Sequence, residues 1–302
     1  MNLLRTPEEC FAELPGFDFP PSYVEIADGD GGVLRTAYVT AGPAEGPVVL
    51  LLHGEPTWSF LYRRLIPVFA RNGFRVVAPD LVGFGRSDKP AEVGDHSYAR
   101  HVAWMTSLVV DALDLRDINL LGHDWGGAIG LGLLPEHRER FSRVVLSNSG
   151  IPYGHVEMPA AWWEFRRTIE NTPGLRVSAL IADLAQSPLP PAVLAAYDAP
   201  FPDDSYKAGP RAMPGLVPVS PDHPTAPASL QIWETLSTLA IPFLCAFSDG
   251  EVFTQPMAAA MQEHIPGARG RRHPVVAGAG HLVQEEAGTS LAQVAVDFFN
   301  ES

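Results

Sequence analysis

The sequence predicts an α/β fold in which a mostly parallel sheet, flanked by helices, carries an inserted helical cap. Apolar runs of strand character alternate with helical segments over the first half of the chain, which is the pattern of a right-handed parallel sheet. The run at residues 48–52 is apolar without interruption, as expected of a strand buried on both faces. Strand-like runs stop near residue 150, where prolines and aromatic residues become frequent.

The expected elements follow one another along the chain. A hairpin at residues 23–39 turns around Asp28-Gly29-Asp30-Gly31-Gly32, because Gly and Asp tolerate the dihedral angles of tight turns. Hydrophobic periodicity then gives the remaining elements. Strands are expected at 48–52, 75–80, 118–121, 143–148, 241–247 and 274–277, and helices at about 60–71, 98–113, 126–131 and 290–299.

The middle of the chain is expected to form a separate unit. Two proline-rich stretches, 188–191 and 200–202, break residues 151–227 into short helices. We therefore expect a core domain made of residues 1–150 and 228–302, with residues 151–227 inserted between two of its strands as a helical cap.

Composition narrows the class of protein. The chain has 302 residues, 46% of them hydrophobic, which is enough for a large core. Its net charge of -14 argues against nucleic acid or an anionic membrane as a partner. The start lacks a signal-peptide apolar region, no 18-residue apolar run occurs, and Cys10 and Cys245 give no disulfide framework. We expect a cytoplasmic monomer that binds no membrane.

The stretch Gly122-His123-Asp124-Trp125-Gly126 is the clearest functional motif. It links an apolar strand to a helix, in the manner of the G-x-S-x-G elbow of serine hydrolases, but with a carboxylate at the tip. A carboxylate is ionised at neutral pH and can attack a saturated carbon directly, which leaves an ester. The alternative is that Asp124 only caps the helix that follows it.

Polar residues stand where other predicted strands end, at the edge of the sheet where reacting groups gather. Glu55 follows the first parallel strand, Asn148 follows the strand at 143–148, and Asp249 and Glu251 follow the strand at 241–247. His281 lies in the turn Gly278-Ala279-Gly280-His281. Nucleophile, acid and histidine therefore occur in the chain order of α/β-hydrolases.

Because an ionised Asp124 needs no base for the first attack, the histidine is expected to act in a later step. His281 is expected to take a proton from water, so that hydroxide attacks the ester. The backbone N–H groups of Glu55 and Trp125 are expected to hold the resulting oxyanion. The Glu55 side chain is a candidate for holding the water, although it could also be an exposed loop carboxylate.

Tryptophans point to the leaving group. An indole N–H only donates, which suits a departing halide. Trp125 beside the nucleophile and a cap tryptophan, Trp162 or Trp163, are the candidates, although either cap residue could simply pack in the core. A departing epoxide oxygen would instead need tyrosine hydroxyls, and the region offers three, at Tyr153, Tyr197 and Tyr206.

Several motifs together resemble the haloalkane dehalogenases. They are Leu4-Arg5-Thr6-Pro7, His53-Gly54-Glu55-Pro56-Thr57-Trp58, the elbow, residues 199–209 of the cap, and Ala279-Gly280-His281 with Gln284-Glu285. The resemblance covers nearly the whole chain. It implies an α/β-hydrolase fold, Asp124 as nucleophile, His281 as base, Trp125 and Trp162 as halide donors, and Glu55 beside the water.

The resemblance also bears on the acid. The chain is similar to the subfamily whose acid follows the later strand, and Asn148 agrees, because the acid position of a sister subfamily is not acidic here. Asp249 and Glu251 are two residues apart, so periodicity cannot choose between them. Asp249-Gly250 has the character of a turn. Glu251 occupies the position of the family's acid, where that family usually has Asp followed by Pro. We expect Glu251, with Asp249 as the alternative.

These observations predict a hydrolase without metal or cofactor that converts small apolar haloalkanes and water into a primary alcohol and a halide ion, through a covalent ester on Asp124. The enzyme alternative is an epoxide hydrolase with the same nucleophile. The non-enzyme alternative is an α/β-hydrolase-fold binding protein that has lost its chemistry.

Overall fold

A seven-stranded sheet forms the centre of the computed structural model, which describes residues 1–301. Its strand order is β2-β3-β5-β4-β7-β8-β9, and the five strands from β5 to β9 in this order run parallel. This arrangement confirms the mostly parallel α/β fold. The strands are β2 (Pro21–Ala27), β3 (Val33–Ala41), β4 (Val48–Leu52), β5 (Arg75–Pro79), β7 (Ile118–His123), β8 (Phe141–Ser147) and β9 (Phe243–Cys245).

The expected hairpin forms the antiparallel edge of this sheet. Strands β2 and β3 pair in register with Glu25 opposite Arg35, and β3 continues antiparallel onto β5. Two pairs of very short strands lie outside the main sheet. They are β1 (Leu3–Leu4) with β6 (Lys89–Pro90), and β10 (Phe247–Ser248) with β11 (Val275–Val276). The late strand expected at 241–247 is thus divided between two sheets.

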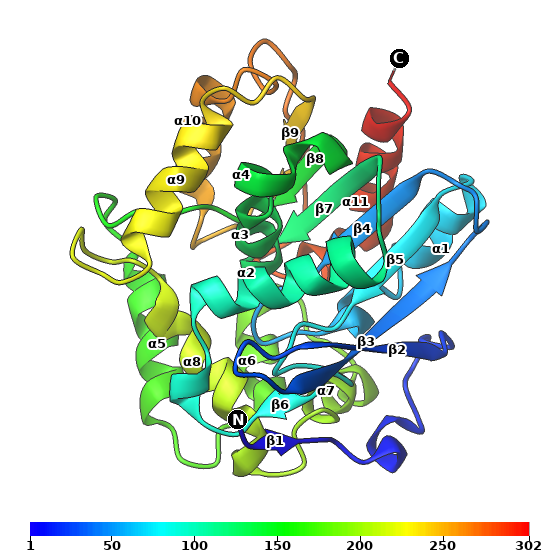
Figure 1. Ribbon diagram of the computed structural model, residues 1–302, viewed down its shortest axis with the longest axis vertical. Helices are drawn as coiled ribbons and strands as arrows, with labels where there is room; N and C mark the ends of the chain where they lie inside the picture. Colours follow the sequence, from blue (N-terminus) through cyan, green and yellow to red (C-terminus); the bar gives the residue numbers. More distant parts are fainter. Residues whose placement is uncertain (302) are drawn as a thin grey trace.

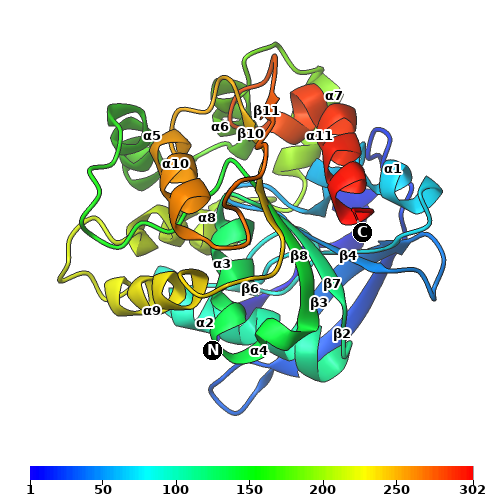
Figure 2. The ribbon, with the colours of Figure 1, turned by 90° about the horizontal axis from the view of Figure 1, so that it is seen from above.

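Helices cover both faces of the sheet. Figure 2 shows α1 and α11 on one face, and α2, α3 and α4 on the other. All five β4 residues are buried, as the uninterrupted apolar run predicts. The helices are α1 (Ile66–Arg71), α2 (Tyr98–Thr106), α3 (Trp125–Gly132), α4 (Leu134–His137), α10 (Gln255–His264) and α11 (Val283–Phe299).

The segment between β8 and β9 is helical wherever it is regular. Figure 1 shows α5 to α8 grouped at one side of the molecule. One apolar cluster runs from the sheet into this segment and includes Trp162, Tyr197 and Ile232. The division into core and cap stays a prediction, and the boundary proposed at 228 falls within α9. The helices are α5 (Ala160–Asn171), α6 (Val177–Leu184), α7 (Pro191–Asp198), α8 (Ala208–Ala212) and α9 (Ala226–Leu236).

None of the helices within residues 1–301 combines the length and the apolar character needed to cross a membrane.

Candidate active site

The elbow between β7 and α3 holds Asp124 at its tip. Asp124 has φ 50 and ψ -127, a backbone conformation that is costly for a residue other than glycine. The turn is tight because its glycines lie against backbone, and a Cβ on Gly126 would lie 2.0 Å from the Leu52 carbonyl oxygen. The Asp124 side chain makes no capping hydrogen bond to α3. It is therefore free for other partners.

The Asp124 carboxylate faces a donor on one oxygen and a histidine on the other. Its Oδ1 accepts a 2.9 Å hydrogen bond from the Glu55 backbone N–H, and its Oδ2 lies 3.6 Å from Nε2 of His281. Burial raises the pKa of Asp124, but the hydrogen bond and charge of His281, with the Trp125 backbone N–H, outweigh burial and lower it overall. The carboxylate stays ionised.

His281 lies between two carboxylates. Its Nδ1 is 2.8 Å from Oε2 of Glu251. Burial alone would lower the pKa of His281, but the negative charges of Glu251 and Asp124 and their hydrogen bonds raise it to about 10. The free site therefore favours the imidazolium form.

Glu251 is anchored by the loop that follows it. Its Oε1 accepts hydrogen bonds from the backbone N–H groups of Phe253, at 2.7 Å, and Thr254, at 2.8 Å. Burial raises the pKa of Glu251, but His281 and these donors reverse the effect and bring it to about 2. Neither donor could be expected from the sequence, because both are backbone groups, which every residue type except proline has.

Asp249 is exposed and has a different set of partners. Its carboxylate accepts hydrogen bonds from Gly278 N–H at 2.9 Å and from Ala279 N–H at 3.2 Å. These backbone hydrogen bonds lower the pKa of Asp249. The structure thus brings Glu251 to His281 and brings Asp249 to the turn that precedes His281.

Asn148 links the two loops of the site. Its side-chain amide donates to Ser248 Oγ and to the carbonyl oxygens of Gly280 and His281, and its Oδ1 accepts from Ser248 N–H. Asn148 itself has φ 45. An amide can both donate and accept in this position, whereas a carboxylate could only accept.

The Glu55 side chain is buried and is not an exposed loop carboxylate. Glu55 is 3% exposed, and its Oε1 has no hydrogen-bond partner among the described residues. Burial first, and the nearby Asp124 charge second, raise the pKa of Glu55 well above its usual value. A protonated carboxyl has both a donor and an acceptor for a water molecule.

The six tryptophans fall into two groups by the partner of the indole N–H. Those of Trp58, Trp104 and Trp233 donate to backbone carbonyls. The other three have no such partner within residues 1–301. Of these three, Trp125 and Trp162 line the cavity above Asp124 and Trp163 does not.

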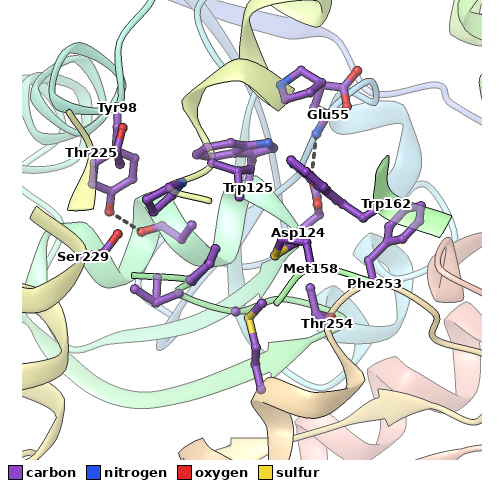
Figure 3. Close-up of a pocket in the computed structure, with 18 of the residues that line it drawn as sticks. Glu55, Tyr98, Asp124, Trp125, Met158, Trp162, Thr225, Ser229, Phe253 and Thr254 are labelled. Carbon is purple, nitrogen blue, oxygen red and sulfur yellow. Dashed lines mark hydrogen bonds between the residues drawn. The ribbon is translucent and has the colours of Figure 1, made fainter. Parts of the chain in front are cut away.

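The cavity itself is mainly apolar (Figure 3) and holds about 750 Å³ of empty space, part of it open to solvent. Tyr98 is the tyrosine on its wall, and its hydroxyl donates a 2.7 Å hydrogen bond to the Ala128 carbonyl oxygen. Tyr98 and several other wall residues were not expected from the sequence. Among these further lining residues are Met158, Val217, Thr225, Ser229 and Met257.

The chain matches the family model described as alpha/beta hydrolase fold over residues 47–287. It is 43% identical to the haloalkane dehalogenase of Psychrobacter cryohalolentis, covering 100% of this chain and 99% of that protein. It is 44% identical to haloalkane dehalogenase 1 of Mycobacterium tuberculosis, covering 97% of each. Among solved structures, the tetrameric haloalkane dehalogenase DpaA from Paraglaciecola agarilytica NO2 matches with a TM-score of 0.89 at 35% identity, covering 100% of both chains. These findings confirm the resemblance seen in the motifs, and the chain belongs to the haloalkane dehalogenase family of α/β-hydrolase-fold proteins.

Proposed function

We propose that this protein hydrolyses the carbon–halogen bond of haloalkanes and yields a primary alcohol and a halide ion, with Asp124 as the nucleophile. The observation that carries the proposal is an ionised carboxylate at the base of an apolar cavity, with two indole N–H groups on the cavity wall that have no partner within residues 1–301. Family membership agrees with this chemistry.

In the first step, a carboxylate oxygen of Asp124 attacks the carbon that carries the halogen, and the carbon–halogen bond breaks with its electron pair on the halide. Oδ2 is the attacking atom, because Oδ1 is held by the Glu55 N–H. Trp125 and Trp162 donate their indole N–H groups to the departing halide. A buried anion needs such donors to offset its lost hydration.

In the second step, water cleaves the ester with His281 as base. The ester carries no charge, so its formation removes one of the two negative charges that raise the pKa of His281. The imidazolium can then release its extra proton to solvent, and the neutral ring accepts a proton from the attacking water. Glu251 stabilises the new imidazolium, the Glu55 side chain orients the water, and the N–H groups of Glu55 and Trp125 hold the oxyanion. When this intermediate collapses, the bond between the Asp124 carboxyl carbon and the alkyl oxygen breaks, and the alcohol leaves with the proton from His281.

The epoxide hydrolase alternative has weaker support. Tyr153, Tyr197 and Tyr206 are absent from the residues that line the cavity. Tyr197 donates its hydroxyl to Glu285. The Tyr98 hydroxyl, which does reach the cavity, is engaged with Ala128.

Halide release from a series of 1-bromoalkanes tests the activity, with an Asp124→Ala variant as the control. We expect release by the unmodified chain and none by the variant. Incubating a His281→Phe variant with 1-bromobutane should add one butyl group to the protein, as seen by intact mass spectrometry. A chain that turns over epoxides but not bromoalkanes would favour the epoxide hydrolase, and a chain inert to both would favour the binding protein.

The monomer stays a prediction, since the similar protein DpaA is described as tetrameric. Size-exclusion chromatography with light scattering distinguishes the two states.

A further inference from the structure

We infer that the cavity has a polar subsite at its far end, and that the preferred haloalkane carries a neutral hydrogen-bonding group, above all a hydroxyl, on the carbon end remote from the halogen. This inference rests on the proposed function and deepens it. Figure 3 shows Thr225, Ser229 and Tyr98 at one end of the cavity, Asp124 and Glu55 at the other, and Trp125 between them.

The side chains of Thr225 and Ser229 lie on the same part of the cavity wall. Ser229 lies in the first turn of α9 and Thr225 directly precedes this helix. Residues four apart on a helix lie on the same face, and both line the cavity. The spacing brings two hydroxyl groups to one patch of the wall.

Both residues are largely buried, and their hydroxyls remain open to the cavity without a protein partner among the described residues. Thr225 is 8% exposed and Ser229 is 4% exposed. Within residues 1–301, neither hydroxyl makes a hydrogen bond, although serine and threonine in helices often bond to the carbonyl one turn back, as Thr235 does with Gln231. A substrate that covers these hydroxyls without pairing would leave them unpaired and buried at a cost, whereas a substrate that pairs with them avoids this cost and binds more tightly.

Tyr98 adds an acceptor to the same end. Its proton is used in the bond to Ala128, so the lone pairs of its oxygen remain for a donor. Thr225 and Ser229 can each donate or accept. A substrate hydroxyl, which also does both, matches this set better than an ether or a second halogen, which can only accept.

Charge excludes the ionised alternatives. Apart from the phenol of Tyr98, the titratable residues on the cavity wall are Glu55, Asp124 and His281, and all three belong to the reacting end. The wall residues contain no lysine or arginine, so a carboxylate tail would be buried without a cation. An ammonium tail would likewise find no anion at the far end.

The experiment compares 1-bromoalkanes with the ω-bromoalkan-1-ols of the same length, over a series of chain lengths. The measured quantity is the ratio of kcat/KM for alcohol to kcat/KM for alkane. This ratio should peak at one chain length in the unmodified chain. Thr225→Val and Ser229→Ala should each lower the peak about 3- to 10-fold, the effect of one neutral hydrogen bond. The loss should appear in KM, because the bond is the same in ground and transition states.

Ser237→Ala is the matched control, because Ser237 follows the same helix but is exposed. It should leave the ratio unchanged.

Two results would overturn the subsite and leave the proposed function standing. One is turnover of bromoalkanes with no peak in the ratio, and the other is a peak that both cavity variants retain. If no bromoalkane is turned over, the proposed function fails. Binding of the matching diols and alcohols, followed by tryptophan fluorescence, then still measures the subsite, and equal affinity for diol and alcohol overturns it.

Discussion

At the scale of single residues, the chemistry depends on which carboxylate holds His281. Glu251 contacts Nδ1 directly, whereas Asp249 holds the backbone of the preceding turn. Glu251→Gln should slow ester hydrolysis on the order of 10²–10⁴-fold, because the imidazolium loses its counter-charge. The alkyl-enzyme should then accumulate in single-turnover mass spectrometry. Asp249→Asn should hydrolyse the ester near the wild-type rate, and the reverse pattern would move the acid to Asp249.

The proposed halide site distinguishes the two neighbouring tryptophans of α5. Trp162 lines the cavity and is 6% exposed, while Trp163 does not line it. Trp162→Phe should weaken bromide binding by about 1.5–3 kcal/mol, the contribution of a hydrogen bond to a charged group. Trp163→Phe should change it little. Quenching of tryptophan fluorescence by bromide measures both, and equal affinities in the wild type and Trp162→Phe would contradict the assignment.

Residues that follow the ends of strands could be predicted from the sequence, because apolar runs show where strands end. Asp124, Glu251 and His281 are such residues, and they come together in the structure. Thr225 and Ser229 could not be predicted in this way, because a Ser/Thr/Pro-rich segment gives no sign of which hydroxyls face a cavity. Periodicity could not choose between Asp249 and Glu251, because the choice depends on how one loop turns, and the expectation of Glu251 came from the family resemblance alone.

At the scale of elements, the strands of the main sheet were predicted well, two expected helices have other bounds, and α4 and α10 were not expected. The helix expected at 60–71 is a 3-10 turn at Ser59–Tyr62 followed by α1. Pro67 stands in the first turn of α1, where its ring prevents the helix from extending further back. The helix expected at 290–299 begins at Val283, with a kink at Ala287. Its first turns show no apolar periodicity in the sequence, because polar residues, Gln284 and Glu285, occupy buried positions there.

A buried ion pair joins three elements of the fold. Arg63 donates to both oxygens of Glu285 in α11, at 2.5 and 2.6 Å, and the hydroxyl of Tyr197 in α7 donates to the same carboxylate. Glu285→Gln leaves the Arg63 charge buried without its partner. We expect a loss of about 3–5 kcal/mol in the free energy of unfolding, measured with urea.

The exposed pair Arg166–Glu170 on α5 is the control. Glu170→Gln should cost only about 0.3–0.5 kcal/mol, because solvent screens the pair. Similar losses in the two variants would show that the buried Arg63–Glu285 pair contributes no more to stability than an exposed pair.

At the scale of the whole molecule, the fold keeps one imidazolium charged inside a protein of net charge -14. The pKa of His281 is raised from 6.5 to about 10 in the folded state. The folded protein therefore holds this proton more tightly than the unfolded chain. Its contribution to stability is fully present below pH 6.5 and is lost as the pH rises through about 10.

His281→Phe removes this contribution. The free energy of unfolding of the wild type should fall between about pH 7 and about pH 9.5, and that of the variant should fall less, because other titrating groups are common to both. His264→Gln is the control, since His264 is exposed on α10 and should keep the wild-type slope. Urea unfolding at the two pH values gives the slopes. Equal slopes for the wild type and His281→Phe would mean that Glu251 and Asp124 do not hold an extra proton on His281, and the second step would then begin from a neutral imidazole.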